Sequence, residues 1–183
     1  MKILQINPYP PENLGGSELF CKNLSLNLSS KENFECDILT SDFLKRNVKI
    51  DFLSNKKVKV IYKQCLFNFW GKNPVVNIFS FLNNNYFNYD IIHIHAYPFF
   101  TSIQAALLKK IRKFPLILHL HGFEINSSLS SGFNAYEKLQ LFFKNHLFDK
   151  YVGKLPIKAA DAIISVTKRD LYIVKKKYNL HSF

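Results

Sequence analysis

Short apolar runs alternate along this chain with longer segments whose apolar residues recur every three or four positions. The short runs predict strands at 2–7, 35–40, 57–63, 90–95, 115–120 and 161–166. The periodic segments predict helices at 17–30, 74–83, 101–112, 134–150 and 168–178. Because strands that alternate with helices usually form βαβ units, we expect an α/β fold: a doubly wound, mainly parallel sheet with helices on both faces.

Local signals support three of these helices. Thr101 with Gln104, and Thr167 with Asp170, have the spacing of a capping box, in which a hydroxyl accepts from a backbone N–H one turn later. We therefore predict N-caps at 101 and 167. The first helix is supported by apolar residues at steps of four, which predict its buried face at Phe20, Leu24 and Leu28.

Two segments match neither pattern. Residues 41–56 are polar and charged, which predicts a loop. Residues 64–73 fit either a loop or an exposed aromatic flap, since they carry Phe67, Phe69 and Trp70. The rest of the chain shows no internal repeat and no linker.

The length and composition indicate a single folded domain over residues 1–183. Hydrophobic residues make up 48% of the 183 positions and phenylalanine fills 18 of them, which argues against disorder. The three scattered cysteines, Cys21, Cys36 and Cys65, lack metal-ligand spacing and are typical of reduced thiols in the cytosol. No signal peptide precedes Met1, and no apolar run approaches the ~20 residues that cross a bilayer. We therefore expect a cytoplasmic protein.

The formal net charge of +12 bears on partners rather than on fold. The basic clusters lie at 109–113, 144–158 and 168–177, and several are flanked by large apolar residues. They fit an anionic membrane surface or a phosphorylated ligand, and a solvated basic face remains the alternative. Nucleic acid is not an expected partner, because no recognition helix or aromatic stacking platform accompanies the charge.

The segment after the first predicted strand is suited to holding an anion. Gly15 and Gly16 can adopt positive φ, Ser17 is a natural N-cap, and Glu18 sits in the first turn of the helix. An ordinary turn is an equally good interpretation of a glycine pair after prolines. The spacing matches neither a Walker loop nor a dinucleotide fingerprint, which disfavours a nicotinamide-dependent oxidoreductase.

Ligands of doubly wound sheets bind beyond the carboxyl ends of the strands. Besides the glycine pair, this rule selects the residues that end or follow three later strands: His93, His95, Ala96, His119, His121, Gly122 and Thr167. The four histidines raise the question of a metal. We expect none, because two H-x-H pairs without a carboxylate or cysteine are more often core or hydrogen-bonding residues. His121, directly before a glycine, is the histidine most suited to face a ligand.

Four segments in order resemble the N-terminal domain of family 4 glycosyltransferases: PYPPENLGGSE, DIIHIHAY, PLILHLHGFE and AADAIISVTKRDLYIVKKKYNL. The resemblance covers essentially the whole chain. It implies one Rossmann-like half of a GT-B fold, in a retaining enzyme that moves a sugar from a nucleotide diphosphate onto a hydroxyl. It also implies that the nucleotide-sugar is bound mainly by a C-terminal domain and the acceptor mainly by this one.

The resemblance assigns roles to particular residues. Gly15 and Gly16 match a glycine loop beside the donor diphosphate and the acceptor, and Glu18 matches an acidic residue that often follows. His121 matches a histidine that contacts the donor sugar, and Gly122 gives the chain room to turn. We add the backbone amide of Ser17, His95 and Thr167 as candidate donor- or acceptor-binding positions, with no cofactor and no metal.

The chain ends at Phe183, about where the hinge to the second domain is expected. We therefore expect the isolated domain to be inactive or nearly so. The acceptor is a soluble sugar or, if the basic clusters bind the cytoplasmic face of a membrane, a lipid-linked molecule. The alternative is a non-catalytic subunit that anchors a separate donor-binding chain at the membrane.

Overall fold

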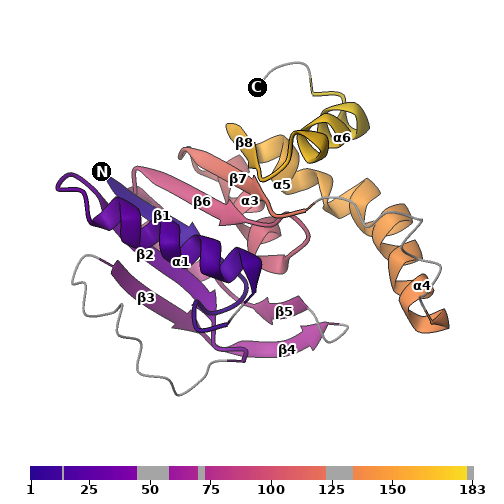
Figure 1. Cartoon of the computed structure of the whole chain (residues 1–183), viewed down its shortest axis with the longest axis horizontal. Coiled ribbons are helices and arrows are strands. Elements are labelled where there is room, and N and C mark those ends of the chain that lie inside the picture. Colours follow the sequence, from indigo (N-terminus) through magenta and orange to yellow (C-terminus); the bar gives the residue numbers. More distant parts are fainter. Residues whose placement is uncertain (14, 45–57, 70–72, 123–133, 181–183) are drawn as a thin grey trace.

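The computed structural model describes residues 1–13, 15–44, 58–69, 73–122 and 134–180. Its centre is a six-stranded, wholly parallel sheet with the strand order β3-β2-β1-β6-β7-β8 (Figure 1). The order reverses between β1 and β6, as in other doubly wound sheets. The strands are β1 (Lys2–Ile6), β2 (Glu35–Ser41), β3 (Val58–Lys63), β6 (Ile91–His95), β7 (Leu116–Leu120) and β8 (Ala162–Ser165). Each lies within one residue of a predicted strand at both ends.

Helices cover both faces of this sheet, as predicted. Helix α1 (Gly16–Ser29) lies over a small core that includes Ile3, Cys36 and Ile38. The opposite face carries the main core, which includes Leu4 and Leu118. This core lies under α2 (Phe79–Asn85), α3 (Phe100–Ile111), α5 (Lys154–Ala159) and α6 (Lys168–Tyr178). A short 3₁₀ turn, η2 (Tyr86–Asn88), follows α2. Among the described helices, none is both long and apolar enough to cross a bilayer.

Helix α1 differs from its prediction in both its cap and its buried face. It begins at Gly16, so Gly15 is the N-cap and Ser17 lies inside the first turn. The buried residues are Glu18, Cys21, Ser25 and Ser29, whereas Phe20 is 37% exposed. The predicted apolar stripe therefore does not supply most of the buried side, although Leu28 packs, partly buried, against the core under α1.

The two predicted capping boxes have opposite outcomes. Thr167 is the N-cap of α6, and its Oγ1 accepts from the Asp170 N–H at 3.1 Å, which confirms that prediction. At α3 the N-cap is Phe99 without a side-chain cap, so the prediction at Thr101 is wrong. Gln104 instead uses its amide oxygen to accept from the N–H groups of Ile78 and Phe79, each at 2.9 Å. A tertiary contact to another segment thus replaces the local cap.

Residues 64–83 are organised differently from the prediction. Strands β4 (Cys65–Phe69) and β5 (Asn73–Val76) form an antiparallel pair where a loop or flap and the start of a helix were expected. The helix α2 starts only at Phe79. Pro74, which is compatible with the first turn of a helix, is equally tolerated at the edge of a two-stranded sheet, and the β-branched Val75 and Val76 favour the strand. Trp70 and most of the predicted loop 41–56, from residue 45 onward, lie outside the described residues.

The single helix predicted at 134–150 consists of two parts. Helix α4 (Ala135–Phe143) starts with a true capping box, in which Asn134 and Glu137 each accept from the other's backbone N–H. It continues as a nine-residue π-helix, η4 (Lys144–Val152), in which i and i+5 share a face. The ion pair from Lys144 Nζ to Asp149 Oδ2 at 3.2 Å joins residues at that spacing. A 3.6-residue period in the sequence does not reveal this change.

Candidate active site

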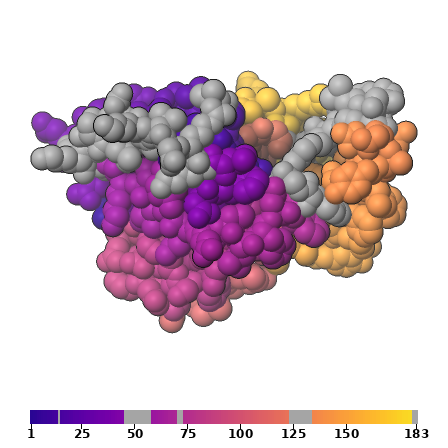
Figure 2. Space-filling model, turned by 90° about the horizontal axis from the view of Figure 1, so that it is seen from below, coloured from indigo at the N-terminus to yellow at the C-terminus, as the bar shows by residue number. Residues whose placement is uncertain are grey.

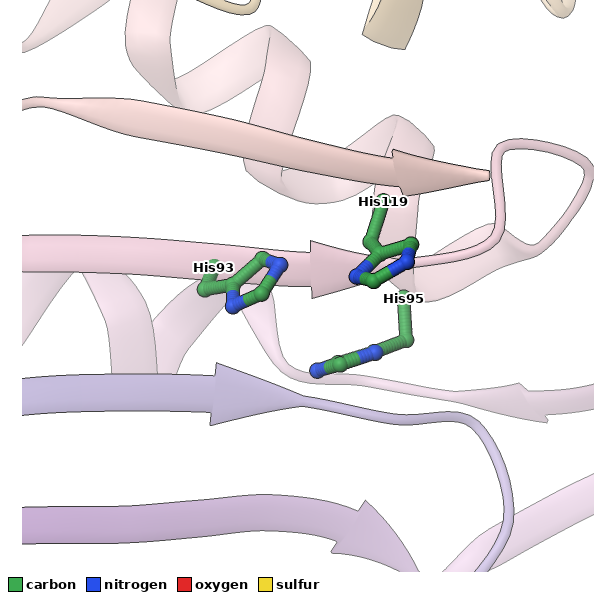
Figure 3. Close-up of side chains that lie close together, drawn as sticks. All are labelled: His93, His95 and His119. Atoms are coloured by element: carbon green, nitrogen blue, oxygen red, sulfur yellow. The ribbon is translucent and has the colours of Figure 1, made fainter. Parts of the chain in front are cut away.

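Strands β1, β6 and β7 are neighbours, and their register brings polar residues together on one face of the sheet. Gln5 pairs with His93, and His95 pairs with His119. Side chains at alternate positions of a strand share a face, so His93 and His95 project on the same side. Figure 3 shows the rings of His93, His95 and His119 close together at this place. The sheet therefore collects residues that are distant in sequence.

A hydrogen-bonded series connects Gln5 and His95 to a further histidine, His121. His95 Nδ1 lies 2.9 Å from His121 Nε2, and His95 Nε2 lies 2.8 Å from the amide oxygen of Gln5. Gln5 and His95 are fully buried, whereas His121 is partly exposed just beyond the end of β7. The series thus runs from the interior of the sheet to its carboxyl edge.

All four histidines are held neutral near pH 7. Burial and, to a smaller extent, the neighbouring imidazoles lower the pKa of His93 to about 3 and that of His121 to about 4. The pKa of His95 is far below its ordinary value for the same two reasons, and burial lowers the pKa of His119. A protonated ring here would lack water and would face other imidazoles, which disfavours the charged form.

Helix α1 covers the histidine cluster through Phe20. The Phe20 ring makes edge contacts with His119 and His121, at centroid distances of 4.5 and 5.3 Å. His119 and His121 stack on each other at 4.4 Å. Phe20, which was predicted to lie on the buried face of the helix, therefore shields the histidine cluster from solvent on one side.

The geometry permits a test of whether the cluster suits a metal ion. Ligand atoms of His93, His95 and His119 lie within 4.8 Å of one another. Both nitrogens of His95, however, are already engaged with His121 and Gln5. Among the described residues, His93 Nε2 and His119 Nδ1 are buried without a hydrogen-bond partner, so an ion bound by these two would need His95 as its third protein ligand in this group of three. A metal would therefore have to break the hydrogen-bonded series.

Two backbone positions turn the chain sharply beside these histidines. Gly122 has φ +120°, a conformation that residues with a side chain rarely adopt, as the predicted turn after His121 requires. Ala96 has φ +65°, and its N–H donates to the His119 carbonyl at 2.8 Å. Each of these positions directly follows a histidine of the series, His95 or His121.

The glycine pair at the start of α1 is used differently from the expectation. Neither glycine has positive φ. A Cβ at Gly15 would lie 2.0 Å from Glu18 Oε2, so the buried carboxylate lies directly against this glycine and would have to move if a side chain were added. No atom lies within 4 Å of a Cβ added at Gly16. An acidic group therefore already stands at the helix N-terminus where we expected the amides of Gly15 to Ser17 to receive an anion.

Only some of the predicted site residues lie in contact with one another. His95 and His121 are hydrogen-bonded, Gly122 follows His121 directly, and Phe20 joins α1 to them one turn after Gly16. Thr167 lies beyond β8, next to β7 in the sheet, but within the described residues no hydrogen bond or ring contact connects it to the histidines. Gln5 was missed. Its signal was a polar residue inside the apolar run of β1, which is unusual for a strand buried on both faces.

Known proteins resemble this chain in sequence. A sequence model of the family described as Glycosyltransferase Family 4 matches residues 14–182. A relative in Methanocaldococcus jannaschii, named as an uncharacterized glycosyltransferase, is 27% identical over 179 residues, which are 92% of this chain and 42% of the relative. The chain therefore spans less than half the length of that relative. The crystal structure of HepE from Anabaena, in complex with UDP and glucose, superposes with a TM-score of 0.46 and 14% identity over 97% of this chain and 50% of that one.

Proposed function

Because this chain belongs to glycosyltransferase family 4, we propose that it is the acceptor-side domain of an enzyme that transfers a sugar from a nucleotide-diphosphate donor to a hydroxyl. A second Rossmann-like domain would bind most of the donor, and the anomeric configuration would be retained. The family match supports the transferase class. The location of the histidine cluster at the carboxyl edge of the sheet supports the site, since ligands of such sheets bind there.

The reaction leaves negative charge on the departing diphosphate and positive charge on the sugar. A group that donates to or accepts from the sugar there must therefore be polar, well positioned and not positively charged, so that it neither repels the developing cation nor needs to reorganise. His121 meets these requirements because burial lowers its pKa to about 4 and His95 holds its ring. We assign to His121 a hydrogen bond to the donor sugar, and we assign no step to a metal.

The glycine loop is the second part of the proposed site. The Glu18 carboxylate lies against Gly15 at the start of α1 and would repel a phosphate there. We therefore propose that Glu18 accepts from hydroxyl groups of the acceptor. Among the described residues, nothing lies within 4 Å of a Cβ added at Gly16, which leaves space for that molecule. Thr167, beyond the end of β8, stays a candidate.

We predict that His121→Ala lowers the turnover number of sugar transfer about tenfold to a hundredfold, because a hydrogen bond to the reacting sugar is lost. The KM for the acceptor should change less, since His121 is assigned to the donor sugar. The measurement is steady-state transfer by a protein that contains this chain and its second domain, screened against common nucleotide-sugars.

The matched control is Asn27→Ala, an exposed residue on α1 away from the strand ends. It should leave both constants unchanged. Equal turnover by His121→Ala and the parent would remove His121 from the site. Transfer by residues 1–183 alone would contradict the assignment of the donor site to a second domain.

We further propose that the acceptor is lipid-linked and that the segment α4–η4 rests on the cytoplasmic face of an anionic membrane. The support is an exposed apolar stripe at steps of three and four residues, which begins on α4, a helix without a buried residue, and continues on η4. Figures 1 and 2 show α4 at one end of the molecule, projecting from the sheet. The stripe consists of Tyr136, Leu139, Phe143, Leu147 and Tyr151. The three free cysteines fit a reducing compartment.

A basic pocket of about 740 Å³ adjoins this stripe and shares Leu147 and Tyr151 with it. Its lysines are Lys150, Lys154, Lys158 and Lys177, against one acidic residue, the buried Asp149. Cations beside large apolar side chains are typical of segments that lie in the interface of anionic bilayers. The pocket therefore supports an anionic surface rather than a neutral one.

We predict that the chain sediments with phosphatidylglycerol vesicles at low salt and much less with phosphatidylcholine vesicles. Leu147→Ser should weaken binding by at least about tenfold, because a leucine side chain contributes about 1.5–3 kcal/mol when it leaves water. Lys154→Gln should weaken it about fivefold, since each lysine near such a surface contributes about 1 kcal/mol.

Controls at other exposed sites separate this surface from a general charge effect. Phe87→Ser on η2 and Lys31→Gln after α1 lie outside the basic clusters and should bind like the parent. If these controls lose as much binding as Leu147→Ser and Lys154→Gln, or if no variant binds anionic vesicles at low salt, the membrane proposal is wrong.

A further inference from the structure

The hydrogen-bonded series from Gln5 to His121 carries information about where its protons lie. The three residues come from β1, β6 and the end of β7, and the two links measure 2.8 and 2.9 Å. Both lengths are those of ordinary hydrogen bonds, so each link has one donor and one acceptor. Each ring is neutral, so each carries a single N–H.

The amide oxygen of Gln5 determines the direction of the series. An amide oxygen only accepts, so the proton of His95 must lie on Nε2, which faces it. His95 Nδ1 is then unprotonated and can only accept from His121. The proton of His121 must therefore lie on Nε2, and its Nδ1 keeps a free lone pair.

We propose that Gln5 and His95 are positioning residues that hold His121 as a hydrogen-bond acceptor at Nδ1. A site with this polarity accepts from a ligand group that donates, such as a hydroxyl. It gives no hydrogen bond to a phosphate or carboxylate oxygen, which can only accept. The identification of the hydroxyl as one of the donor sugar rests on the proposed function; the proton arrangement itself does not.

The rest of the cluster does not supply a competing proton relay. His93 Nε2 and His119 Nδ1 have no hydrogen-bond partner, and Phe20 contacts His119 and His121 through its ring. The one arrangement that reverses the series is a rotated Gln5 amide, with its NH₂ group donating to His95. His121 Nδ1 would then carry the proton, and the site would offer a donor to its ligand.

Nitrogen NMR on the ¹⁵N-labelled chain distinguishes these arrangements. We expect a through-hydrogen-bond coupling between His121 Nε2 and His95 Nδ1, with the one-bond proton coupling on His121 Nε2. Resonances are assigned by single His→Asn variants. A proton on His95 Nδ1 would overturn the acceptor role of His121, and the lack of any coupling between the two nitrogens would overturn the series. Neither result depends on activity, so failure here is separate from failure of the transferase assignment.

A variant tests whether Gln5 sets the direction. Gln5→Met keeps the length of the side chain but removes its acceptor, so the proton between His95 and His121 should no longer be confined to His121 Nε2. Thr40→Val is the matched control, because Thr40 is fully buried in the neighbouring strand β2 and its Oγ1 has no partner. It should leave every imidazole signal in place. An unchanged proton position in Gln5→Met would show that Gln5 has no positioning role; should that variant not fold, the couplings of the parent chain still decide the proposal.

Discussion

Lowering the pH from 7 to 5 is expected to reduce the free energy of unfolding by about 4 kcal/mol through His93 and His95 alone. Both rings are nine-tenths or more removed from water, and burial lowers their pKa values, that of His93 to about 3. In the unfolded chain the same rings titrate at their ordinary pKa of 6.5. Each therefore contributes about 2 kcal/mol of pH-dependent stability over this interval.

The direction follows from which state binds protons first. Above pH 6.5 both states are neutral and the stability is fully present. As the pH falls below 6.5, the histidines of the unfolded chain bind protons while those of the folded chain stay unprotonated, so unfolding becomes more favourable. The loss continues until the pH reaches the folded-state pKa values. His119 and His121, whose pKa values are also lowered but which are more exposed, should add a smaller loss in the same window.

Urea unfolding at pH 7, 6 and 5 measures this effect. His93→Leu should remove about half of it, because Leu cannot take up a proton and His93 Nε2 has no hydrogen bond to lose. His146→Gln, at an exposed position on η4, is the control and should keep the full dependence. If the free energy of unfolding does not change between pH 7 and 5, the histidines bind protons as readily in the folded chain as in the unfolded chain, and the prediction is wrong.

Replacement of Asp149 by alanine is expected to lower the free energy of unfolding by about 3 kcal/mol. Asp149 lies in η4 and is 1% exposed. Its carboxylate accepts from Tyr97 Oη at 3.1 Å, Lys144 Nζ at 3.2 Å and Lys177 Nζ at 2.9 Å. These donors come from the turn after β6, the π-helix and α6. Removal of the carboxylate leaves a buried hydroxyl without this acceptor and two ammonium groups without their counter-charge, which is why the effect is large.

The contrast is Asp161→Ala, because Asp161 forms an equally short ion pair with Lys109, at 2.8 Å, but is half exposed. Solvent screens that pair, and Asp161 Oδ2 also accepts from the Leu116 N–H at 2.7 Å, so its removal should cost about 1–2 kcal/mol, less than the removal of Asp149. Chemical denaturation of both variants at pH 7 provides the comparison. An Asp149→Ala protein as stable as Asp161→Ala would show that the three donors find other partners when the carboxylate is gone.

The strands could be predicted closely because a strand that is buried on both faces is a nearly continuous apolar run with polar residues at its ends. The helix α6 matched its prediction at 168–178 because its cap is local: the hydroxyl of Thr167 and the N–H of Asp170 are three residues apart. The predictions failed where a distant partner competes with a local one. Gln104 binds the backbone of Ile78 and Phe79 rather than capping its own helix, and Pro74 lies in a strand because β4 pairs with it.

The site shows the same division. His95, His121 and Gly122 could be chosen from the sequence, since they directly end or follow apolar runs, and Gly122 does have the positive φ that its turn needs. The role of Gly15 could not be chosen in this way, because it depends on where the Glu18 carboxylate lies in space.

Local patterns of apolar and polar residues were thus enough to predict the parallel α/β architecture and the strand ends at which ligands bind, because burial repeats at short, regular spacings along the chain. Only the tertiary structure shows two further sets of contacts. One is the series of hydrogen bonds from His121 through His95 to Gln5. The other is the group of Tyr97, Lys144 and Lys177 around Asp149. Gln5 and His95 are 90 positions apart, and the register between β1 and β6 brings them within 2.8 Å. No local spacing encodes that register, because it is set by the packing of all the strands together.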